Sequence, residues 1–152
     1  MRRTVLIVLV TVFAFASLVT SPRASAGRAQ GPLLEGAQVD PAVLGILNRS
    51  CRDCHSEQTN YPWYSYVAPV SILIGSDVKR GREHLNFSEW PQYSKIRRER
   101  ALSEIANQVK DRDMPLTIYL LLHPSARLSS SDVDTVFNWT QQERLRLIMN
   151  RQ

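Results

Sequence analysis

Hydrophobic residues recur at helical spacing along most of this chain. Asp40-Pro41 opens a first apolar helix that runs toward residue 51, because Asp can accept backbone N–H bonds at an N-cap and Pro is tolerated at the first helical position. Further helices are predicted over residues 69–85, 95–110 and 129–149, with a short helix over 116–123. No segment alternates as a strand does. The pattern predicts an all-α fold of four to five helices.

Each predicted helix has an apolar stripe that we expect to face the core. The stripes are Val43, Leu44, Ile46 and Leu47; Val70, Leu73, Ile74, Val78 and Leu85; Ile96, Leu102, Ile105 and Val109; and Val133, Val136, Phe137, Thr140 and Leu147. Residues 56–68 and 86–94 contain turn-forming residues and are predicted to connect helices. Ser129 or Ser130 is expected to cap the last helix.

The N-terminus has the pattern of a secretory signal. Arg2 and Arg3 precede about sixteen apolar residues, and Ala24-Ser25-Ala26 fits a cleavage site. We therefore predict that residues 1–26 are a signal peptide cut before Gly27, which leaves an exported, periplasmic protein without a stable membrane span. The alternative is an uncleaved N-terminal anchor, for which the apolar run is shorter than the roughly 20 residues expected.

Cleavage would change the apparent charge of the chain. The whole chain has 19 basic and 14 acidic residues, but three arginines and no acid belong to the signal, which leaves 16 basic and 14 acidic residues and a net charge of +2. This balance gives no case for nucleic-acid binding. The remaining 126 residues suffice for one domain. We predict a linker or loosely packed N-terminal arm over 27–39 and a monomeric domain over 40–152.

The chain's only two cysteines, Cys51 and Cys54, are followed directly by His55. The spacing C-x-x-C-H indicates a c-type haem attachment site. Cysteines three apart lie on one side of a helical turn, so both thiols can reach the vinyl groups on one edge of a porphyrin. His55 is then the proximal iron ligand, and the predicted cofactor is one covalently attached haem c.

Three other interpretations of the cysteine pair are weaker. A thioredoxin-like dithiol belongs in a βαβ context, and no strands are predicted here. A zinc site needs two more ligands, and His84 and His123 do not have zinc-finger spacing. A Cys51–Cys54 disulfide would close a very small loop and constrain the unfolded chain little.

Aromatic residues near the motif could line a haem pocket, which needs apolar walls and a few polar groups. The candidates are Tyr61, Trp63, Tyr64, Tyr66 and Trp90. The alternative for each of them is ordinary packing in the core.

The second axial ligand decides between electron transfer and ligand binding. Met114 lies in "DRDMPL", at a predicted break before a proline, where a rigid turn could present its sulfur to the iron. Its alternative role is to fill a gap in the core. His123 is the competing distal ligand, although it could instead cap helix carbonyls. His84 is expected on the surface or near a propionate, and Met149 is expected to pack.

Several motifs together resemble a known family. The chain contains C-x-D-C-H-S, P-W-Y-S, A-P-V-S, G-R-x-x-L-N-F-S-x-W, a later M-P, and H-P-x-A-x-L-S before a helix with Trp139. This pattern, over Asp40 to Glu143, resembles the small bacterial haem-binding domain with a single C-x-x-C-H motif. The resemblance implies an exported monohaem, cytochrome c-like bundle with Cys51, Cys54 and His55 as its haem site. It does not imply a substrate.

Two function classes follow. The first is an electron carrier that passes single electrons between redox partner proteins and needs no substrate pocket. The second is a sensor or peroxidase-like enzyme with an open distal site for a gas or peroxide, although no distal acid–base pair is evident near Met114. An exported helical domain without haem is the third possibility.

Overall fold

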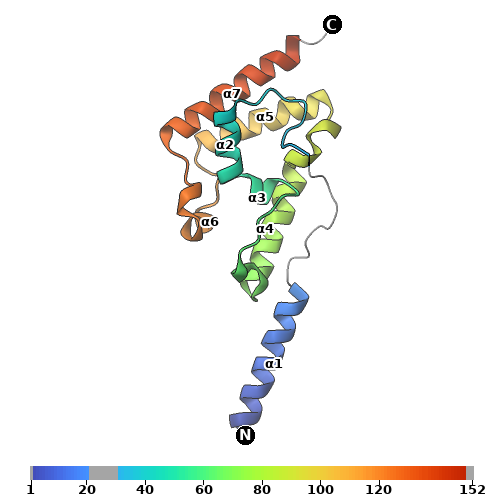
Figure 1. Ribbon diagram of the computed structural model, residues 1–152, viewed down its shortest axis with the longest axis vertical. Coiled ribbons are helices and arrows are strands. Elements are labelled where there is room, and N and C mark those ends of the chain that lie inside the picture. Colours follow the sequence, from blue (N-terminus) through green and yellow to red (C-terminus); the bar gives the residue numbers. More distant parts are fainter. Residues whose placement is uncertain (1, 21–30, 150–152) are drawn as a thin grey trace.

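The computed structural model describes residues 2–20 and 31–149, and these residues form helices and loops without a strand (Figure 1). The α-helices are α1 (Arg2–Thr20), α2 (Pro41–Ser50), α3 (Arg52–His55), α4 (Val70–His84), α5 (Lys95–Lys110), α6 (Thr117–Leu122) and α7 (Ser130–Met149). Three 3-10 helices join them: η1 (Trp63–Tyr66), η2 (Phe87–Gln92) and η3 (Pro124–Ala126). The predicted all-α class is confirmed. The expected cleavage site at Ala24–Ala26 lies outside the described residues.

The core lies between α5 and α7, which run antiparallel, and α2, which packs against α7 (Figure 1). The chain leaves α2 through the single turn of α3, and α4 packs against that turn. The α1 helix projects from the opposite end of the domain. The main core residues are Val43, Ile46, Leu47, Phe87, Trp90, Tyr93, Leu102, Ile105, Val109, Val133, Val136, Trp139 and Leu147.

Local capping signals account for where the helices begin. Asp40 accepts the Ala42 N–H at 2.8 Å and thereby caps α2, whose first residue is Pro41. At α7, Ser129 Oγ accepts the Asp132 N–H at 3.0 Å, and Asp132 Oδ2 accepts the Ser129 N–H at 2.8 Å. This reciprocal pair satisfies two backbone donors, as a capping box does. The expectation that Ser129 or Ser130 caps the last helix is confirmed for Ser129.

The Asp132 cap should make stability depend on pH. Bonds from Ser129 and the nearby Arg49 guanidinium, 2.9 Å away, lower the pKa of Asp132. A carboxylate with a lowered folded-state pKa stabilises the fold above its unfolded pKa, near 3.9, and loses that contribution as the pH falls through the folded value. Asp132→Asn should therefore cost about 1 kcal/mol at pH 7, and the difference from wild type should shrink below about pH 4. Urea unfolding at both pH values measures this. An equal loss at both would contradict the charged cap.

Residues 31–39, the described part of the predicted N-terminal arm, pack more tightly than expected for a loose linker. Leu34 is 1% exposed and belongs to the core, and its N–H donates to the Phe87 carbonyl at 3.1 Å. The buried Glu143 carboxylate pairs with Arg146, whose guanidinium also donates to the Gly36 carbonyl at 3.0 Å. The sequence showed few periodic apolar positions here because this segment is anchored by single residues and side-chain bonds rather than by a helix face.

Two residues predicted on buried stripes are exposed. Ile96 in the first turn of α5 is 72% exposed, and Leu73 on α4 is also exposed. On each helix the rest of the stripe is covered to a greater extent, as Leu102 and Val78 show. Burial depends on which part of a helix its neighbours cover, and both exposed residues lie in the first turn of their helix.

Candidate functional site

The cysteine–histidine motif forms one tight turn at the end of α2. The Cys51 N–H donates to the Leu47 carbonyl, and the Cys51 carbonyl accepts the N–H groups of Cys54 at 3.3 Å and His55 at 3.0 Å. Both cysteines are free thiols and half-buried. A single helical turn therefore carries two thiols and one imidazole, as the sequence predicted.

The electrostatics of the thiols do not suit a redox dithiol. Burial, together with the neighbouring Cys54, raises the pKa of Cys51 to about 12. Burial, with the Asp53 and Asp77 charges, raises the pKa of Cys54 to about 11. Reactive dithiols need a stable thiolate, which requires a lowered pKa. No cluster of three or more His, Cys, Asp or Glu side chains in the described ranges could hold a metal ion by itself.

His55 is oriented as a metal ligand would be. Its Nδ1 lies 3.0 Å from the Leu85 carbonyl oxygen, which can only accept, so Nδ1 carries the proton. Burial lowers the pKa of His55 and outweighs the opposing effect of the Leu85 and Gly81 carbonyls. This favours the neutral ring, in which Nε2 is the nitrogen without a proton. Metal-binding histidines commonly donate their second nitrogen to a carbonyl in this way. The Leu85 carbonyl, which directly follows α4, was not identified from the sequence.

Gly81 allows α4 to lie directly against the motif. A Cβ built at this position would come within 2.6 Å of the Cys54 carbonyl oxygen and 3.3 Å of the Cys54 Cβ. Only a residue without a side chain permits this approach. The signal for this contact in the sequence is the glycine itself, since a glycine inside a predicted helix often has a packing reason.

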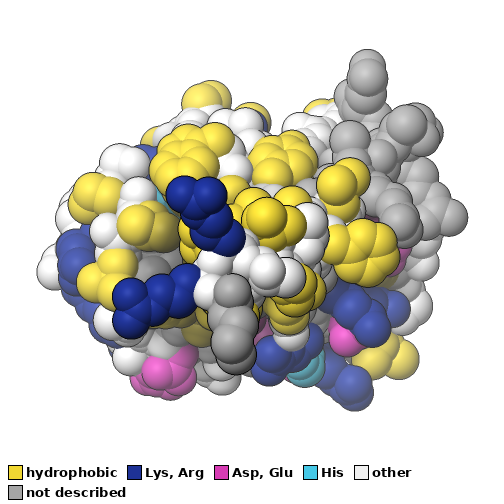
Figure 2. Space-filling model, turned by 90° about the horizontal axis from the view of Figure 1, so that it is seen from below, with side chains coloured by type: hydrophobic (Ala, Val, Ile, Leu, Met, Phe, Trp, Pro, Cys, Tyr) yellow, Lys and Arg dark blue, Asp and Glu magenta, His cyan; other side chains and the backbone are white. Residues whose placement is uncertain are grey.

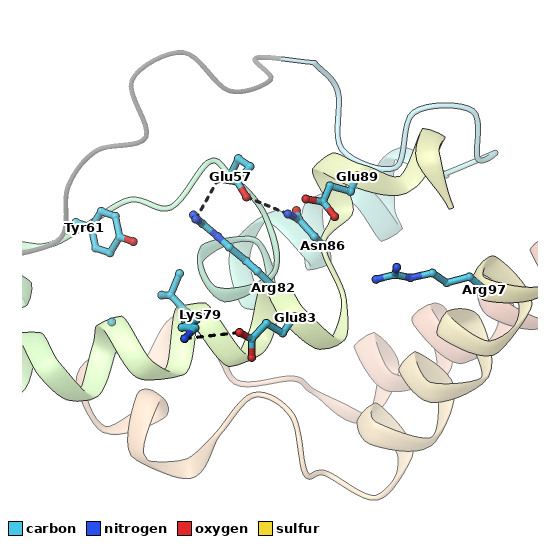
Figure 3. Close-up of a pocket in the computed structure, with 10 residues that line it drawn as sticks. Glu57, Tyr61, Lys79, Arg82, Glu83, Asn86, Glu89 and Arg97 are labelled. Atoms are coloured by element: carbon cyan, nitrogen blue, oxygen red, sulfur yellow. Dashed lines mark hydrogen bonds and ion pairs between the residues drawn. The ribbon is translucent and has the colours of Figure 1, made fainter. Parts of the chain in front are cut away.

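The loop after the motif is held by charged and polar groups. The Arg82 guanidinium of α4 donates to the Ser56 carbonyl and to Thr59 Oγ1, both at 2.9 Å, and pairs with Glu57 at 3.0 Å. Figure 3 shows Arg82 pointing toward Glu57, which also accepts a bond from Asn86. The second residue between the cysteines, Asp53, accepts the Asn60 N–H at 3.0 Å. These bonds fix the loop relative to the motif.

The hollow in Figure 3 is too highly charged for a porphyrin. It has a volume of about 460 Å³, and its lining includes Glu57, Lys79, Arg82, Glu83, Glu89 and Arg97. Haem sites need mostly apolar walls. The α6 helix provides a more suitable surface, because Ile118, Leu121 and Leu122 are exposed on it. A hydrogen bond of 3.3 Å from Tyr119 of this helix to Asp53 ties α6 to the motif.

The five aromatic residues predicted to line the haem pocket lie in different environments. Tyr64 donates to His123 on the α6 side, while Tyr61 lines the charged hollow. Trp63 is 78% exposed, and Tyr66 is also exposed. Trp90 is fully buried in the core, where packing explains it without a cofactor. Haem contact by these residues stays a prediction, and Tyr64 has the position most consistent with it.

Both ring nitrogens of His123 already have partners. Its Nδ1 lies 3.1 Å from the Tyr119 carbonyl, and its Nε2 lies 2.9 Å from the Tyr64 hydroxyl. The ring also stacks on Tyr119 at 4.0 Å between centroids. Because the Tyr119 carbonyl can only accept, Nδ1 carries the proton and Nε2 accepts from Tyr64. Ligation of iron by His123 would require the Tyr64 bond to break.

Met114 is half-buried in the turn between α5 and α6. Its N–H donates to the Gln108 carbonyl at 3.2 Å, which closes the turn onto α5. Arg112, with a left-handed φ of 63°, donates to the Leu128 carbonyl at 2.8 Å and pins the same turn to the segment before α7. The expected fixed turn is present, and iron ligation by Met114 stays a prediction.

Comparison with known proteins gives one informative result. The chain matches no curated protein and no solved structure significantly. Residues 7–142, most of the chain, match the family described as haem-binding domain. The free thiols, the neutral His55 ring and the apolar face of α6 fit a haem group. The chain therefore belongs to the haem-binding domain family, and its function includes haem binding.

Proposed function

We propose that this protein is an exported c-type haem protein that passes single electrons between partner proteins. The observation that carries the proposal is the His55 ring, whose Nδ1 is held by the Leu85 carbonyl beside two free thiols, so that Nε2 is available to iron. Cys51 and Cys54 hold the haem c, and His55 orients it. When bound, the haem supplies a one-electron iron couple.

Attachment needs no oxidant. Each thiol would add across one vinyl C=C bond, so that its sulfur would bond to one carbon and its hydrogen would go to the other. The two thioethers keep the cofactor in an exported protein even if the fold opens. Cys51 and Cys54 are both free thiols, which this addition requires.

Absorption spectra of oxidised and reduced protein, before and after denaturation, test the proposal. The host must have intact machinery for covalent haem attachment. We expect one haem per chain that stays with the polypeptide through denaturation and organic extraction. Haem that is extracted would refute attachment through Cys51 and Cys54. A chain that takes up no haem would also exclude the redox role.

The distal ligand decides whether the haem carries electrons or binds a small molecule. Met114→Ala should abolish the Met–iron charge-transfer band, allow carbon monoxide to bind the reduced protein, and lower the midpoint potential, because a His/Met pair raises it. Met149→Ala is the matched control, since Met149 does not pack as expected but is 71% exposed near the end of α7. His123→Ala tests whether His123, rather than Met114, is the distal iron ligand. Ready carbon monoxide binding by the unmutated protein would favour the sensor or peroxidase-like alternative instead.

A further inference from the structure

The α1 helix has the length and composition of a membrane span. Residues Arg2–Val19 have a mean hydropathy of 1.9, and none of this stretch is buried inside the structure. Without Arg2 and Arg3, α1 has 17 residues and extends about 26 Å at 1.5 Å per residue, which is at the lower end of the range for a helix that spans a bilayer. A signal sequence passes the same test, so length alone does not decide whether α1 is kept.

The C-terminal end of α1 contacts the haem domain. The Ala68 N–H donates to Ser17 Oγ at 3.2 Å. Ala16 and Ser17 are half-buried, whereas residues 2–15 are exposed. This last part of α1 packs against η1 and α4, while the rest projects clear of the domain (Figure 1). A contact between α1 and the domain would serve no purpose in the mature protein if α1 were removed. The family match also includes α1 from residue 7 onward.

Large side chains around this contact are exposed. Trp63 and Tyr66 on η1 are exposed, as are Ile72 and Leu73 in the first turn of α4. Figure 2, viewed from the end where α1 projects, shows hydrophobic side chains gathered at this end of the molecule, those of α1 among them, with Lys or Arg between them. Trp and Tyr are enriched where proteins meet lipid headgroups, because their rings are apolar with one polar group. The occupant that fits this surface is a membrane interface.

We propose that α1 is retained as a transmembrane anchor and that Trp63, Tyr66, Ile72 and Leu73 dock the haem domain on the lipid surface beside it. Arg2 and Arg3 then stay on the cytoplasmic side, which places the domain on the outer side. This departs from the expectation of cleavage before Gly27. It also assigns Trp63 and Tyr66 to lipid rather than to the haem pocket, and it does not depend on how haem is attached.

Retention of α1 is tested on the full chain in a bacterial host. Membranes washed with alkaline carbonate should keep the protein, and its intact mass should include α1. The Cys51→Ala/Cys54→Ala variant should be retained equally, which separates this result from the haem proposal. A soluble protein that begins at Gly27 overturns the proposal.

Docking is tested with the purified full chain in vesicles of phosphatidylethanolamine and phosphatidylglycerol that contain a phospholipid with a diazirine near its headgroup. After illumination, cross-links should concentrate in residues 61–74, and Ile72→Ser/Leu73→Ser should lose most of them. Ile96→Ser is the matched control, because Ile96 is similarly exposed but lies on α5. It should leave the labelling unchanged. An anchored chain labelled no more at 61–74 than around Ile96 overturns the docking surface.

Discussion

Replacing both Cys51 and Cys54 by alanine should reduce covalently held haem from one per chain to none. Both thioethers are lost, and the His55–iron bond alone does not survive denaturation. Alanine is preferred to serine because Cys51 packs against the core, where a hydroxyl would need a partner. Each single variant should keep haem through its remaining thioether. The measurement is haem retained by the chain after denaturation and extraction.

Histidine variants extend this test to the iron. His55→Ala should leave thioether chemistry possible but remove the proximal ligand, so any attached haem should have an altered spectrum. His84→Ala is the control, since His84 is exposed at the end of α4. Haem that survives denaturation in the double cysteine variant would contradict attachment at this motif. An unchanged spectrum in His55→Ala would contradict its role as proximal ligand.

The features predicted correctly from the sequence are those set by neighbouring residues. Asp40 and Ser129 cap helices through bonds to residues two or three positions away. Likewise, the Cys51 to His55 spacing defines its own turn. The periodic stripes identified most of the core because a helix buries one face.

The features that the sequence did not reveal join distant parts of the chain. The Leu85 carbonyl that orients His55 lies 30 residues away, and the bond from Tyr64 to His123 spans 59 residues. Leu34 reaches the core from a segment without periodicity, and Ile96 has the right spacing but no covering neighbour. Such contacts depend on how helices pack, which one helix's pattern does not specify.

Gly81→Ala should destabilise the protein and disturb haem attachment, while Gly75→Ala on the same helix should not. At position 81 the new Cβ would lie 2.6 Å from the Cys54 carbonyl oxygen, which is backbone and cannot rotate away. Either α3 or α4 must shift, at a cost of about 1–3 kcal/mol for overpacking. At position 75 a Cβ meets nothing within 4 Å. There alanine should gain up to about 1 kcal/mol from helix propensity.

The two glycine variants therefore isolate the α3–α4 contact, because both gain the same helix propensity and only one creates a clash. Urea unfolding of the haem-free proteins gives the difference in stability, and the yield of covalent haem reports whether Cys54 keeps its place. We expect Gly75→Ala to be the more stable of the two and to attach haem normally. We expect Gly81→Ala to attach less, because a displaced Cys54 thiol no longer matches its vinyl group. Equal stability of the two variants would mean that α4 can shift at position 81 without a loss of stability. The geometry of the motif would then be set by α2 and by the loop that Arg82 binds.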